Sequence, residues 1–155
     1  MIEIERKFLI QKVNFETLAV SKNTIAQGYL NSDANRTVRV RLKNDQGYLT
    51  IKGASNASGT SRFEWEKEID FEEAQALLEL CEDHIIAKTR YVIPHGSHLF
   101  EVDVFHGKNE GLVLAEVELQ AENETIEKPK WLGEEVTGKK EYYNSYLSKH
   151  PFTTW

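Results

Sequence analysis

The sequence predicts a mainly β domain of the α+β class, with a few helices covering the strands. Segments that alternate apolar and polar residues recur along most of the chain, as expected when successive side chains of a strand point to opposite faces. One segment instead repeats its apolar residues at helical spacing. The only flexible-looking stretch is GASNASGT, residues 53–60, which predicts a loop between two strands. The 155 residues contain no internal repeat, so we expect a single domain, residues 1–155.

About eight segments have the alternation of a β-strand. Each is apolar on one face and largely polar on the other, as a strand with one buried face requires. In chain order they are MIEIERKFLI (1–10), IAQGYL (25–30), TVRVRLK (37–43), GYLTIKG (47–53), RFEWEKEID (62–70), AKTRYVI (87–93), LFEVDVF (99–105) and LVLAEVELQ (112–120).

Helical patterns appear in three places. In residues 70–81, DFEEAQALLELC, apolar residues recur every three to four positions, and Asp70 followed by Glu73 fits a helix start. Residues 14–20, NFETLAV, predict a second, short helix, and residues 135–150 carry a weaker helical pattern.

Composition and charge restrict the class of protein. The formal net charge of −6 argues against broad binding to nucleic acid, which requires a surplus of Lys and Arg. No stretch approaches about 18 apolar residues, so we expect neither a membrane span nor a signal peptide. Cys81 is the only cysteine and lacks metal-binding spacing, which favours a reducing, cytoplasmic location. The sequence leaves open whether two copies form a homodimer.

Charges of like sign share the polar faces of the predicted strands. Arg39 aligns with Arg41, and Glu64 aligns with Glu66. Two like charges at i and i+2 lie about 7 Å apart and repel by roughly 0.6 kcal/mol in water and about 2.4 kcal/mol at an effective dielectric near 20. An ordinary solvated face would mix the signs. The other such pairs are Glu3 with Glu5, Lys88 with Arg90, Glu101 with Asp103, and Glu116 with Glu118.

Two folds fit this pattern. In a barrel turned inside out, the charged faces would line an enclosed lumen, and outward apolar residues such as Phe8 and Val40 would need covering helices. In a plain β-sandwich, the same charges would face solvent. Whichever fold holds, carboxylates without His or Cys suit Mg²⁺ or Mn²⁺, and paired basic side chains suit several phosphates, which is the chemistry of phosphoryl transfer.

The order of these motifs resembles the CYTH superfamily, the triphosphate tunnel metalloenzymes. IEIERKFL contains the ExExK core of Glu3, Glu5 and Lys7. QGYL, RVRLK, TIKG, EWE, KTRY, EVDVF and AEVEL follow in the family's order over nearly the whole chain, and residues 131–137 resemble the W-x-G-E-E-V-T of short bacterial members. The resemblance implies an eight-stranded antiparallel β-barrel tunnel with a charged lumen. It also implies binding of a linear triphosphate with a divalent metal, Mg²⁺ or Mn²⁺, and hydrolysis of inorganic triphosphate.

The resemblance also implies roles for individual residues. Tyr29 of QGYL would accept a proton, and since a free tyrosine has a pKa near 10, this requires nearby cations. The alternative for Tyr29 is a packing aromatic that only orients a water molecule. The phosphate-binding set would be Lys7, Arg39, Arg41, Lys52, Lys88 and Arg90. The acidic lining, of which a subset would hold metal, would be Glu3, Glu5, Glu64, Glu66, Asp103, Glu116 and Glu118.

Some questions stay open at this stage. Lys139 and Lys140 stand where related short members tend to have an acid before the base, so the sequence does not decide whether the final helix closes one tunnel mouth. Glu68 and Glu101 share the acidic faces, and we expect both at the surface or rim. Alternative activities are an adenylate cyclase of the class IV type, a thiamine or nucleoside triphosphatase, and a non-catalytic polyphosphate-binding module.

Overall fold

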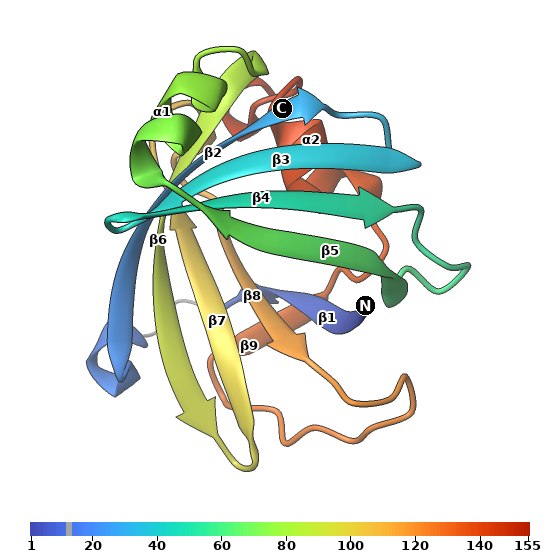
Figure 1. Ribbon diagram of the computed structural model, residues 1–155. Coiled ribbons are helices and arrows are strands. Elements are labelled where there is room, and N and C mark those ends of the chain that lie inside the picture. The colour runs from blue at the N-terminus through green and yellow to red at the C-terminus, as the bar shows by residue number, and fades with distance from the viewer. Residues whose placement is uncertain (12–13) are drawn as a thin grey trace.

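The protein, described here by a computed structural model covering residues 1–11 and 14–155, is a closed antiparallel β-barrel (Figure 1). The strands are β1 (Ile2–Ile10), β2 (Ser21–Asn31), β3 (Arg36–Lys43), β4 (Gln46–Gly53), β5 (Ser61–Ile69), β6 (Glu82–His95), β7 (His98–Phe105), β8 (Val113–Glu118) and β9 (Leu132–Glu135). Their order is β5-β4-β3-β2-β6-β7-β8-β1, and pairing of β1 with β5 closes the ring. The predicted eight-stranded barrel is therefore confirmed, and the sandwich alternative is wrong.

The strand β9 lies outside the eight-stranded ring and was not predicted. It pairs with β1 through Phe8–Glu135 and Ile10–Leu132. Its four residues, LGEE, have no alternation of apolar and polar side chains, so the pattern gave no signal for a strand.

The predicted helix at residues 70–81 forms as α1 (Phe71–Leu78) and packs outside β2, β3 and β4 (Figure 1). The buried Ala74 lies against Gly47, where an added Cβ would come within 2.6 Å of the Ala74 Cβ. The predicted short helix at 14–20 is a single 3₁₀ turn, Glu16–Leu18. The C-terminal tail forms a 3₁₀ turn, Lys140–Tyr142, then α2 (Asn144–Leu147) and a second 3₁₀ turn, Phe152–Thr154.

The apolar residues form two clusters that the barrel separates. The larger cluster lies against the outer face of β1, β7 and β8, where Phe8, Phe100 and Val117 pack with Trp131 and Leu132. The smaller cluster includes Leu147 of α2 packed with Ile86, Phe105 and Leu114. These three strand residues share their strand faces with Lys88, Asp103 and Glu116, so α2 closes one end of the lumen with an apolar contact. None of the helices in the described ranges is long and apolar enough to span a membrane.

Candidate active site in the barrel lumen

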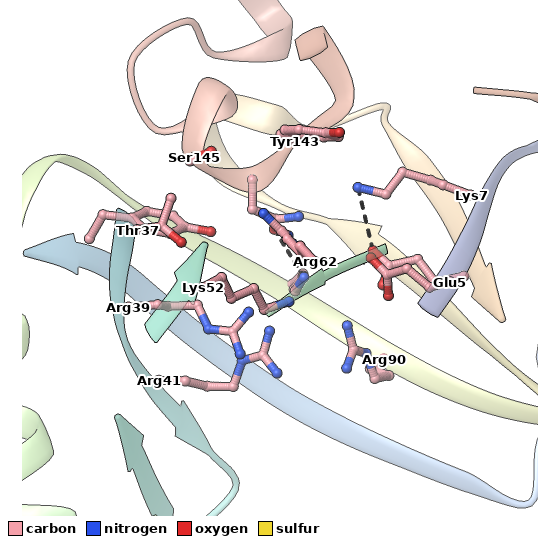
Figure 2. A pocket seen from close by; sticks show the side chains of 14 residues that line it. Glu5, Lys7, Thr37, Arg39, Arg41, Lys52, Arg62, Arg90, Tyr143 and Ser145 are labelled. Carbon is pink, nitrogen blue, oxygen red and sulfur yellow. Dashed lines mark hydrogen bonds and ion pairs between the residues drawn. The ribbon is translucent and has the colours of Figure 1, made fainter. Parts of the chain in front are cut away.

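The six predicted phosphate-binding side chains all line the lumen. They extend from β1, β3, β4 and β6, because residues at alternate positions of each strand face inward (Figure 2). Each is less than a tenth exposed, although Lys and Arg are rarely buried without partners. The set is Lys7, Arg39, Arg41, Lys52, Lys88 and Arg90.

Most of the predicted acidic residues form ion pairs with these cations along the barrel wall, between strands that are paired or one strand apart. Lys52 Nζ lies 2.9 Å from a carboxylate oxygen of Glu3 and 3.3 Å from one of Glu64. Arg39 lies 3.4 Å from Glu66, which also accepts a hydrogen bond from Thr50 Oγ1 at 2.7 Å. Unlike charges of the lumen therefore neutralise one another between neighbouring strands.

Asp103 has the most complete set of basic partners. Arg90 donates to it through Nε at 2.7 Å and through Nη2 at 2.9 Å, and Lys88 Nζ lies 2.7 Å away. Burial alone would raise the pKa of Asp103, but Arg90 and Lys88 outweigh burial and lower this pKa to about 2. For Lys88, burial has the larger effect and lowers the pKa to about 7, although the neighbouring Asp103 favours the charged amine.

Glu5 has the opposite surroundings. It lines the enclosed cavity, and no Lys, Arg or His nitrogen in the described ranges lies within 4.0 Å of its carboxylate. Burial, followed by repulsion from Glu116 and Glu3, raises the pKa of Glu5 well above its ordinary value. Burial opposes ionisation of Glu116 too, but Lys7, Arg90 and Lys88 lower its pKa, and it shares a hydrogen bond with Glu5. The two neighbouring carboxyl groups thus differ: the surroundings of Glu5 favour its protonated form, and those of Glu116 favour its ionised form.

The donor set around Glu5 fits a hard divalent cation. Its atoms are carboxylate oxygens without His or Cys, and a cation would relieve the repulsion among Glu3, Glu5 and Glu116. Within residues 1–11 and 14–155, no three acidic, His or Cys side chains converge closely enough to hold a metal by themselves. This agrees with Mg²⁺, which is commonly bound by one or two carboxylates together with substrate phosphates.

The cationic side of the cavity has spare hydrogen-bonding capacity. Arg39 Nε is buried and has no hydrogen-bond partner. Burial, with repulsion from Arg39 and Arg90, lowers the pKa of Arg41 to about 9. Tyr29 is 5% exposed, lines the same cavity and pairs with Arg39 in the β2–β3 register. The arrangement can bind a polyanion between several cations.

The opposite mouth of the lumen is acidic. Glu66 and Glu118 lie exposed at this mouth, and Glu64 and Glu101 are partly exposed beside them. Glu68 is exposed, as expected for the surface or rim, and Glu101 lies 3.3 Å from Arg90. The lumen therefore has a covered cationic end and an open acidic end.

Sequence reasoning missed several residues of the covered end. Arg62 shares the inward face of β5 with Glu64, so strand alternation could have found it. Thr37 lines the cavity and Gln27 contacts Arg41, but neither carries a charge that would single it out. Tyr143 and Asn144 come from the tail, and no local pattern places a tail residue inside a barrel.

Comparison with known proteins assigns nearly the whole chain to one protein family. The CYTH domain family model matches residues 1–151. The chain is 48% identical over 152 residues to an inorganic triphosphatase of Acetivibrio thermocellus, covering 97% of this chain and 95% of the relative. It is 37% identical over 153 residues to an inorganic triphosphatase of Nitrosomonas europaea, covering 96% and 97% of the two chains. The solved structure of the inorganic triphosphatase NE1496 superposes with a TM-score of 0.67 at 33% identity, covering 94% of this chain and 97% of that one.

Proposed function

The chain belongs to the CYTH domain family, and we propose that it hydrolyses inorganic triphosphate to pyrophosphate and phosphate inside its charged barrel, with a divalent metal ion. The observation that carries the proposal is the lumen itself. It holds six buried cations beside Glu5, a carboxyl group with no Lys, Arg or His nitrogen within 4.0 Å in the described ranges, as a polyanion bound with a metal would require. The relatives at 48% and 37% identity that are named inorganic triphosphatases support the choice of substrate.

The triphosphate would bind at the covered, cationic end. Arg39 offers its unpartnered Nε, and Arg41 offers the guanidinium nitrogens that its single side-chain hydrogen bond leaves free. Lys7 and Lys52 line the same cavity from β1 and β4. One guanidinium group can donate two parallel hydrogen bonds to a phosphate. This set of cations can therefore hold the chain of phosphates in one orientation.

Glu5 and Glu116 would hold the Mg²⁺ or Mn²⁺ ion, with Glu3 next to them. When bound, the ion would neutralise charge that develops on the phosphate oxygens and activate water as a Lewis acid. Asp103, Glu3 and Glu66 were also predicted to line the metal site, but each lies within 3.4 Å of a Lys or Arg nitrogen. We propose that Asp103 and Glu66 act as counter-ions that orient the phosphate-binding cations.

Tyr29 would accept the proton from the attacking water. Its side chain lines the same cavity as Arg41 and Arg62. If Tyr29 is only a packing aromatic, Tyr29→Phe should keep most of the turnover.

Phosphate release tests the function directly. The purified chain would be given inorganic triphosphate, ATP or thiamine triphosphate, each with Mg²⁺, Mn²⁺ or a chelator. We expect metal-dependent release that is fastest from inorganic triphosphate. Formation of cyclic AMP from ATP would favour the cyclase alternative, and tight triphosphate binding without turnover would favour the binding module.

We also expect a cytoplasmic location, because Cys81 is a free thiol.

A further inference from the structure

The C-terminal tail is seated directly on the phosphate-binding cavity. Figure 2 shows Tyr143 and Ser145 on the turn above the cationic side chains. Lys7 Nζ donates to the backbone carbonyl of Tyr142 at 3.1 Å, and the Tyr143 ring lies 5.3 Å from Lys7 Nζ and 5.6 Å from the Arg62 guanidinium. The tail thus contacts cations of the site as well as the apolar residues at this end of the lumen.

Asn144 is the tail residue with the most specific contacts to the site. Its Oδ1 accepts hydrogen bonds from Lys88 Nζ at 3.0 Å and from Gln27 Nε2 at 3.1 Å. Gln27 in turn accepts a hydrogen bond from Arg41 Nε at 2.8 Å through its Oε1. One oxygen of the tail therefore connects two phosphate-binding candidates on different strands.

These contacts restrict which atoms of Lys88 and Arg41 can bind an anion. Lys88 Nζ has three donors, of which one faces Asp103 and one faces Asn144. Arg41 uses Nε on Gln27, so its terminal nitrogens are left for a ligand. Gln27 is fully buried and Lys88 is 1% exposed, so water can hardly replace these partners.

We propose that Asn144 is a positioning residue for phosphate binding: it fixes Lys88 directly, and Arg41 through Gln27, in the orientation that receives the triphosphate. The proposal rests on the proposed function for the identity of the ligand. It also makes the seated tail part of the site, since the cations are oriented only while Asn144 is in place.

The tail has other anchors, which allows positioning to be separated from docking. Leu147 is fully buried in the smaller apolar cluster. Asn109 Oδ1 accepts a hydrogen bond from the backbone N–H of Phe152 at 2.8 Å, and Asn109 is 2% exposed. Asn109 is absent from the lining of the cavity, so it offers a matched Asn→Ala control that loosens the tail without touching Lys88 or Gln27.

The test compares Asn144→Ala, Asn144→Asp and Asn109→Ala in phosphate release from inorganic triphosphate. We expect Asn144→Ala to lower kcat/KM about 10- to 100-fold, the range for lost hydrogen bonds to charged groups. Asn144→Asp keeps the accepting oxygen, so kcat should return to within about threefold of wild type, while KM stays raised because a negative charge faces the phosphate. Asn109→Ala should lower the thermal midpoint but keep kcat/KM.

Three results would overturn the positioning role. They are an Asn144→Ala enzyme with kcat/KM within twofold of wild type, an equal loss of kcat/KM in Asn109→Ala, or a kcat in Asn144→Asp as low as in Asn144→Ala. Absence of turnover by the wild-type chain would count against the proposed function instead. In that event, calorimetric binding of inorganic triphosphate to wild type and Asn144→Ala would still decide the positioning role, with weaker binding by the variant expected.

Discussion

Asp103 on β7 and Glu5 on β1 belong to one lumen, yet their surroundings are opposite. Asp103 is 2% exposed and contacts Arg90 and Lys88, and these two cations lower its pKa against the effect of burial. Glu5 lies beside Glu116 and Glu3, and burial and these carboxylates raise its pKa. A carboxylate with bound cations stabilises the barrel, whereas one among other carboxylates destabilises it until a cation arrives. On this contrast we propose that Asp103 is a structural carboxylate and that Glu5 is available to a metal.

The largest expected effect is on turnover when the metal or its candidate ligand is removed. Chelation should abolish phosphate release, and Glu5→Gln should lower kcat/KM about a hundredfold to a thousandfold, because the metal supplies several kcal/mol of transition-state stabilisation. Steady-state kinetics with inorganic triphosphate measures this. The matched control is Glu134→Gln on β9, whose carboxylate is 66% exposed, and it should stay within about twofold of wild type. A Glu5→Gln enzyme with more than a tenth of wild-type activity would remove Glu5 from the metal site.

The next largest effect is on stability when Asp103 loses its charge. Asp103→Asn should lower the free energy of unfolding by about 3 to 5 kcal/mol, because it leaves Lys88 and Arg90 buried without their carboxylate. Urea unfolding at pH 7 with a chelator present measures it. A loss under about 1 kcal/mol would show that the cations find other partners, and that Asp103 is not a structural counter-ion.

A smaller effect should appear on acidification. The pKa of Asp103 is about 2 in the folded chain against an ordinary 3.8, so its contribution is fully present above the ordinary pKa and is lost as the pH falls from about 4 to about 2. The contribution is about 2 kcal/mol. Urea unfolding from pH 5 to pH 2 should show a steeper loss for wild type than for Asp103→Asn. Parallel curves for the two proteins would contradict the lowered pKa.

The smallest effect is expected outside the lumen. Arg6 lies on the outer face of β1 and donates to Glu135 on β9 at 2.9 Å and 2.7 Å, with side-chain exposures of 21% and 36%. Arg6→Gln should cost about 1 kcal/mol or less and leave kcat/KM unchanged, because exposed ion pairs contribute little. Thermal unfolding and phosphate release together check this. A loss of activity would mean that charges outside the barrel also act on the site.

The sequence predicted which residues share a strand face because strand alternation depends only on local spacing. Lys7, Arg39 and Glu64 were placed on charged faces for this reason, and all three line the lumen. Closure of the barrel could not be derived from the pattern, since it depends on the pairing of β1 with β5, which are far apart in the chain. The resemblance to a known family supplied it.

The roles of individual lumen residues could not be read from the pattern. Glu5 and Asp103 both looked like metal-binding carboxylates, and only their contacts with neighbouring strands distinguish them. The position of Asn144 depends on the packing of Leu147 into an apolar cluster made by three distant strands. Such tertiary contacts leave no local periodicity in the sequence.

The most direct test of the contrast between Glu5 and Asp103 is the thermal unfolding of Glu5→Gln and wild type in chelator, at pH 8 and at pH 4. Because folding raises the pKa of Glu5, this residue lowers the free energy of unfolding at any pH above its ordinary pKa of 4.5. The loss disappears at lower pH, where the folded and unfolded chains both hold the proton. We therefore predict that Glu5→Gln raises the midpoint by about 2 °C or more at pH 8 and hardly changes it at pH 4. A lower midpoint for Glu5→Gln at pH 8 would show that the Glu5 carboxylate stabilises the barrel, and would contradict the account.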